Sequence, residues 1–167
     1  MSPELVKIIA GIVATFGFAL IFRLKPHHWI FATLDGAIAC VVYFLFAAIF
    51  PDNVFIPNII AAFCCSFGAE IFARVCKAPT TVFMLPGCIA LVPGGSLYYS
   101  MSNLLNENYR DAAQYLLVTI EVGAAIGGGI IIAAFVKYVV FGVVDRIQSK
   151  KDNKKRRYSI IFRQREN

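Results

Sequence analysis

The chain has 167 residues, of which 59% are hydrophobic and 16% are charged, and its mean hydropathy is +0.70. Soluble domains carry about 25% charged residues, so this composition excludes a soluble globular protein and favours one whose solvent is mostly lipid. The net charge of +6 lies at one end, because from Asp145 onward nine basic residues oppose three acidic ones. A basic tail beside a membrane span indicates the cytoplasmic side of the membrane rather than nucleic-acid binding.

Apolar runs long enough to cross a bilayer as helices, about 20 residues each, follow one another along the chain. They cover residues 5–22, 29–50, 54–76, 80–101 and 112–141. The first run is too long for a signal-peptide core and ends in Arg23-Leu24-Lys25-Pro26, so we expect it to remain as a span. We therefore predict an all-α, polytopic membrane helix bundle of about five spans over residues 1–145, followed by a basic cytoplasmic tail over residues 146–167.

The connections between these runs alternate in charge. Arg23 and Lys25 mark one connection, and Arg74 and Lys77 mark another that falls on the same side as the basic tail. Since Lys and Arg favour the cytoplasmic side, this pattern predicts an N-terminus outside and a C-terminus inside. The expected location is the cytoplasmic (inner) membrane.

Two acidic residues lie inside the second and third runs, where an ionisable group is expensive and marks a functional site by default. Asp35 and Glu70 are each about two helical turns from the cytoplasmic end of their run, so we expect them at a similar depth. Glu70 either pairs with Arg74 one turn later or takes part in transport, and both interpretations stay open. Asp35 has no basic residue nearby in the sequence.

The fourth run contains Pro86-Gly87 and Pro93-Gly94-Gly95. Proline removes a helical hydrogen bond, and adjacent glycine lets the chain unwind. Within a membrane the freed backbone groups need protein or a water-filled cavity around them. The two motifs therefore predict a discontinuous helix whose free amide groups bind a carboxylate, as in many transporters. The alternative is a re-entrant or kinked helix that only caps the bundle.

The fifth run contains Gly123 and Gly127 in a GxxxG spacing, which predicts close packing against another helix. The cysteines show no metal-binding spacing and are interpreted as packing residues; they are Cys40, Cys64, Cys65, Cys76 and Cys88. The adjacent His27 and His28 are interpreted as interfacial polar residues. No nucleophile–base pair, metal-ligand spacing or nucleotide-binding loop appears, so we predict no enzyme activity, no metal site and no cofactor.

A more specific pattern joins the third and fourth runs. Glu70 is followed by the segment APTTVF at residues 78–83, then by Pro86-Gly87, Val92-Pro93-Gly94-Gly95 and the aromatic Tyr98. This order resembles the threonine/serine exporter (ThrE) family, and within it the small YjjB-type subunit that corresponds to the family's C-terminal half. The resemblance is expected to cover residues 1–145, so the basic tail lies beyond it.

The resemblance implies secondary-active export of small carboxylate-bearing metabolites, either threonine and serine or succinate-like dicarboxylates. It also implies a larger membrane subunit that supplies the other half of the transporter, which an odd number of spans independently suits. On this hypothesis the substrate carboxylate meets backbone amides near the two proline-glycine motifs, and Thr80 and Thr81 line the cytoplasmic approach. Asp35 or Glu70 carries the coupling proton.

Two other functions stay open at this point. One is a membrane scaffold or assembly subunit whose broken span packs against a partner and transports nothing. The other is a homo-oligomeric channel in which the glycine-rich fifth span forms the interface.

Overall fold

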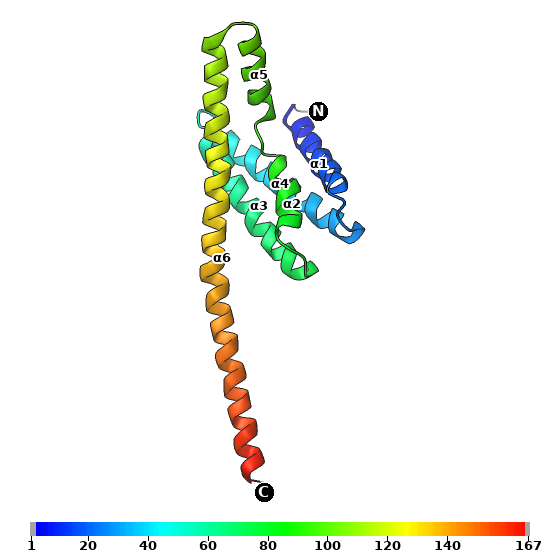
Figure 1. Cartoon of the computed structure of the whole chain (residues 1–167), viewed down its shortest axis with the longest axis vertical. Coiled ribbons are helices and arrows are strands. Elements are labelled where there is room, and N and C mark those ends of the chain that lie inside the picture. Colours follow the sequence, from blue (N-terminus) through cyan, green and yellow to red (C-terminus); the bar gives the residue numbers. More distant parts are fainter. Residues whose placement is uncertain (1–2, 166–167) are drawn as a thin grey trace. The chain divides into compact units, whose positions relative to one another are not determined.

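The computed structural model describes the backbone of residues 3–165 and the side chains of residues 5–140. The regular elements of this part of the chain are all α-helices (Figure 1). They are α1 (Pro3–Ile21), α2 (Pro26–Ile49), α3 (Phe55–Cys76), α4 (Thr81–Ile89), α5 (Gly94–Leu105) and α6 (Tyr109–Arg165). The chain divides into two compact units, Met1–Ala133 and Ala134–Asn167, and the features below belong to the first. The predicted all-α class is confirmed.

Three helices in the described residues are long and apolar enough to cross a membrane: α2, α3 and the Tyr109–Val140 part of α6. The bent pair of α4 and α5 makes a fourth crossing if it forms a single span. The apolar part of α1, Leu5–Ile21, is shorter than these helices. A polytopic helical bundle is thus supported, whereas the count of five spans, the orientation and the boundary at residue 145 stay predictions.

The helix ends have local causes. α2 begins at Pro26, whose missing N–H and fixed φ suit the first turn of a helix. α3 begins after Asn53, whose Oδ1 accepts the backbone N–H groups of Phe55 (2.9 Å) and Ile56 (3.0 Å). α3 ends at Cys76, and the following Lys77 adopts the left-handed conformation with φ of 50°, which lets the chain turn back toward α4.

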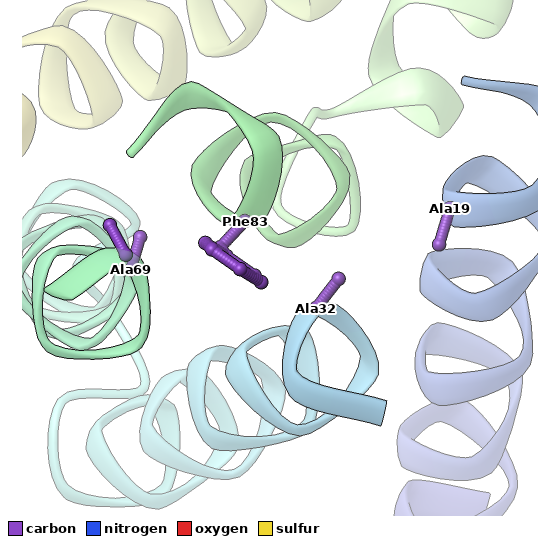
Figure 2. Packing of buried hydrophobic residues seen from close by; sticks show 5 residues of the cluster. Ala19, Ala32, Ala69 and Phe83 are labelled. Carbon is purple, nitrogen blue, oxygen red and sulfur yellow. The ribbon is translucent and has the colours of Figure 1, made fainter. Parts of the chain in front are cut away.

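Small residues let the first four helices approach closely. Lipid is as apolar as a protein core, so helices in a membrane associate through close packing more than through the hydrophobic effect. Ala32 of α2 and Ala69 of α3 are fully buried. Figure 2 shows the ring of Phe83, which α4 places between these two alanines. Phe83 is also fully buried, so it fixes α4 against both neighbours.

The fourth apolar run breaks at one place. α4 ends at Ile89, α5 begins at Gly94, and the two helices meet at a bend of 51°. The break expected at Pro93 is confirmed. At Pro86-Gly87, by contrast, α4 stays helical. Proline removes only one backbone hydrogen bond there, and the neighbouring helices hold the rest of α4 in place.

Candidate functional site

Asp35 lies where α2, α3 and α4 meet, and it is fully buried. Its Oδ2 accepts a hydrogen bond from the thiol of Cys65, with 3.3 Å between the two atoms. Its Oδ1 is buried and has no hydrogen-bond partner among the residues that the structure describes. A buried carboxyl with one unsatisfied oxygen costs free energy, so packing alone does not account for this residue.

Two glycines on neighbouring helices make room for this carboxyl group. A Cβ atom on Gly68 of α3 would collide with Asp35 Oδ1. A Cβ atom on Gly87 of α4 would lie 3.1 Å from Asp35 Oδ2 and 2.7 Å from Cys65 Sγ. The glycine of the Pro86-Gly87 motif therefore permits a close approach of α4 to Asp35, and it does not open the helix for a ligand.

Cys65 and Cys88 extend the contact from Asp35 into α4. Their Sγ atoms lie 3.7 Å apart, and either thiol can be the donor. Cys65 is also fully buried among apolar residues, so its interpretation as a packing residue was incomplete. Sequence reasoning missed this contact because isolated cysteines on two different runs carry no spacing signal. The described residues contain no group of three or more histidine, cysteine and acidic side chains that suits a metal ion.

Glu70 has partners of its own. Its Oε1 pairs with Arg74 at 3.3 Å, one turn later on α3, and its Oε2 accepts a hydrogen bond of 2.6 Å from the hydroxyl of Thr80. Thr80 is the residue before α4, so Glu70 ties the end of α3 to the start of α4. Thr81 is exposed. The pairing of Glu70 with Arg74 is thus present, and the transport role of both threonines stays a prediction.

A cavity of about 300 Å³ borders the break between α4 and α5. Residues 90–96 form one wall, and further lining residues come from α1, α2, α3 and α6. Among the described lining residues the only charged one is Lys7 of α1, which sequence reasoning had not singled out. Gly94 and Gly95, at the first turn of α5, have open space where a side chain would begin. The cavity therefore adjoins Pro93-Gly94-Gly95 and not Pro86-Gly87.

The glycine-rich part of α6 approaches α3 at Gly129. A Cβ atom on Gly129 would lie 2.9 Å from Ala62 Cβ and 3.0 Å from the backbone N of Phe63, so α6 approaches α3 closely there. Gly123 and Gly127 have no neighbouring atom within 4 Å of that position. Their role at an interface stays a prediction, and within this unit it is Gly129 that makes the close contact.

Apolar helices, a bend inside one of them and a buried carboxyl group define a polytopic helical membrane protein. A family model described as "Threonine/Serine exporter, ThrE" matches residues 7–151, and the chain belongs to this family. Family membership gives the chain a transport role of the threonine/serine exporter type. No curated protein and no solved structure matches the chain.

Proposed function

We propose that this chain is one part of a secondary-active exporter in the cytoplasmic membrane. Its substrates are small metabolites that carry a carboxylate: threonine and serine, or succinate-like dicarboxylates. The observation that carries the proposal is the cavity at the α4–α5 break, because it combines a cationic side chain with the first turn of a helix. Family membership supports the same class of solute.

Lys7 and the start of α5 offer complementary recognition of a carboxylate. The first backbone N–H groups of a helix lack intrahelical partners and carry a partial positive charge. In this cavity the Gly94 N–H already donates to the carbonyl of Val92 at 2.8 Å, which leaves the N–H groups of Gly95 and Ser96 for a ligand, and Gly95 has no side chain to block the backbone. Lys7 adds a full positive charge, and the buried Asn58 supplies a further polar side chain. A volume of about 300 Å³ lies at the small end of ligand pockets, which suits a small metabolite.

Asp35 is the better candidate for the coupling proton. Glu70 is already engaged by the cation of Arg74 and the hydroxyl of Thr80. Asp35 is buried against helix backbones and has an oxygen with no hydrogen-bond partner among the described residues. Proton binding removes the charge of such a group, and in a membrane that change is large in free energy. Glu70 and Thr80 then serve to hold the start of α4.

A larger membrane subunit supplies the remaining helices of the pathway. The cavity adjoins the break of the bent pair α4 and α5, and transporters commonly place their site between two related halves. Gly123 and Gly127 give α6 a face on which another helix can approach closely. The basic residues after position 145 lie outside the described side chains and take no part in this argument.

The proposal is tested by efflux from cells in which the chain is deleted and then restored. Labelled threonine, serine and succinate are loaded, together with a diamine that has no carboxylate as a control. Restoring the chain is expected to restore efflux of at least one carboxylate-bearing solute and to leave the diamine unchanged. Unaltered efflux of all three in the deleted cells, with the larger subunit present, would indicate a scaffold. Gradient-independent flux through the purified chain alone would indicate a channel.

Lys7 gives the sharpest test of the cavity. Lys7→Gln removes the only charge among the described lining residues, so the half-saturating substrate concentration is expected to rise about tenfold, equivalent to about 1.4 kcal/mol. Lys7→Arg keeps the charge and serves as the matched control. Equal half-saturating concentrations for Lys7→Gln and the unaltered chain contradict the assignment of the cavity.

A further inference from the structure

Three groups from three helices form a continuous row in the interior of the first unit. Asp35 Oδ2 of α2 lies 3.3 Å from Cys65 Sγ of α3, and Cys65 Sγ lies 3.7 Å from Cys88 Sγ of α4. The proposed function uses only the first of them. Asp35 and Cys65 are buried and Cys88 is partly buried, so each member's hydrogen bonding depends on its neighbour's.

The direction of the hydrogen bonds along this row depends on whether Asp35 holds a proton. A thiol is both a weak donor and a weak acceptor. With Asp35 ionised, Cys65 donates its S–H to Asp35 Oδ2, and Cys88 donates to Cys65 Sγ. With Asp35 protonated, its O–H donates to Cys65 Sγ, and Cys65 donates to Cys88 Sγ. The only atom gained is the proton on Asp35, and the bonds that change are hydrogen bonds.

We infer that Cys65 is a positioning residue for Asp35, and that the Cys65–Cys88 pair transmits the protonation state of Asp35 to the end of α4. The inference rests on the proposed function only in taking Asp35 as the coupling group. Cys65 does not touch the transported solute in this account. It orients the carboxyl group and passes a change in hydrogen bonding to the next helix.

The end of α4 is where such a change reaches the cavity. The backbone N–H of Leu91 donates to the carbonyl of Cys88 at 3.0 Å, and Leu91 lines the cavity together with Ala90. Cys65, Cys88 and Leu91 also pack in one apolar cluster. A reorientation of the Cys88 thiol therefore occurs one turn from the wall of the proposed substrate site.

The other polar groups around Asp35 do not substitute for the thiol pair. On α1 the contact to this region is Thr15, whose hydroxyl donates to the carbonyl of Gly11 at 2.8 Å and does not titrate. On α2 the next titratable group is Cys40, which borders Gly11. On α3 the next are Cys64, which is adjacent to Cys65 in the sequence, and Glu70, which Thr80 and Arg74 engage. On α4 it is Cys88 itself.

The test is infrared difference spectroscopy of the full-length chain in lipid, recorded as the pH is lowered. A C=O stretching band of a protonated carboxyl group is expected to appear, and Asp35→Asn is expected to lack it. In the unaltered chain the S–H stretching bands are expected to shift at the same pH as that band appears. In Asp35→Asn the S–H bands are expected to stay constant across the titration.

Variants of Cys65 separate a positioning role from a packing role. Cys65→Ala removes the donor that favours the ionised carboxyl, so the C=O band is expected about one pH unit higher, a tenfold change in proton affinity. Cys65→Ser keeps a donor and is expected to return the band close to its original pH. The matched control is Cys64→Ala, because Cys64 is the next residue on the same helix and is expected to leave the titration unchanged.

The inference is overturned if S–H bands stay still while the Asp35 band appears, or if no Asp35 band appears at any pH. It is also overturned if Cys64→Ala shifts the band as much as Cys65→Ala. Efflux is measured on the same variants, so the two ideas fail separately. If the chain exports solute but its S–H bands do not shift with pH, the proposed function stands and the role of the Cys65–Cys88 pair is rejected. If the S–H bands shift together with the Asp35 C=O band but the chain exports no solute, the role of the Cys65–Cys88 pair stands and the proposed function is rejected.

Discussion

The fourth apolar run uses the same residue pair, proline followed by glycine, for two different purposes. At Pro86-Gly87 the helix continues, both residues are buried, and Gly87 brings α4 against Asp35. At Pro93-Gly94 one helix ends and another begins, and the glycine adjoins a cavity. One motif brings helices together, whereas the other leaves space between them.

The difference lies in what surrounds each motif. Proline always removes one backbone donor, and glycine always removes a side chain. On α4, Phe83 and Gly87 pack against α2 and α3, so the helix is held on both sides. At Gly94 no atom lies within 4 Å of the position that a side chain would occupy, so the chain is free to bend there. The following substitutions test this comparison.

Gly87→Val is expected to have the largest effect. Its Cβ would lie 2.7 Å from Cys65 Sγ and 3.1 Å from Asp35 Oδ2, so the thiol must move and the carboxyl group must shift slightly. Overpacking of this kind lowers the free energy of unfolding by about 1–3 kcal/mol. Thermal unfolding of the purified chain in detergent measures the change. Gly94→Ala is the matched control, expected within about 0.5 kcal/mol of the unaltered chain. Equal losses of unfolding free energy for Gly87→Val and Gly94→Ala would contradict the proposed difference between the two motifs.

Thr80→Val is expected to have an intermediate effect, because it removes the hydroxyl that donates to Glu70 at 2.6 Å. The expected loss is about 1 kcal/mol in the free energy of unfolding, since Arg74 still pairs with Glu70. Thr81→Val changes the neighbouring, exposed threonine and is expected to alter stability by less than about 0.5 kcal/mol. If Thr81→Val destabilises the chain more than Thr80→Val, the tie between Glu70 and α4 is not the relevant contact.

Gly95→Ala is expected to have the smallest effect on stability, because its added methyl group meets no atom within 4 Å. It does place a methyl group beside the cavity at the start of α5. The half-saturating substrate concentration is therefore expected to rise roughly fivefold, which corresponds to a loss of about 1 kcal/mol in binding free energy. Concentration-dependent efflux measures this change. A fall in thermal stability without any change in that concentration would show that the break serves packing.

The sequence was sufficient for the features that hydropathy and motif spacing encode. The abundance of apolar residues predicted a helical membrane protein, and the motifs around Glu70 and Pro93 predicted the family that the family model identifies. The place of Asp35 inside an apolar run marked it as a functional candidate, and the structure shows that it is buried. The ion pair of Glu70 with Arg74 was one of two open interpretations, because residues one turn apart on a helix are neighbours in any fold.

The contacts between helices were not predictable in the same way. In a membrane, lipid-facing and protein-facing positions are both apolar, so hydropathy does not tell which face of α3 meets α2 and α4. The approach of Cys65 and Gly68 to Asp35 depends on that rotation. The position of Lys7 at the cavity depends on how α1 packs, and Pro86-Gly87 stays helical because of its neighbours.

The central claim is that Asp35 couples solute export to the proton gradient, and Asp35→Asn tests it most directly. Two rates are measured in membrane vesicles that contain the chain and the proposed larger subunit: net efflux driven by a proton gradient, and exchange of labelled for unlabelled solute without a gradient. The account predicts that Asp35→Asn abolishes gradient-driven efflux and retains exchange, whereas Glu70→Gln reduces both rates together. Gradient-driven efflux at the unaltered rate in Asp35→Asn, at equal protein level, would contradict the account.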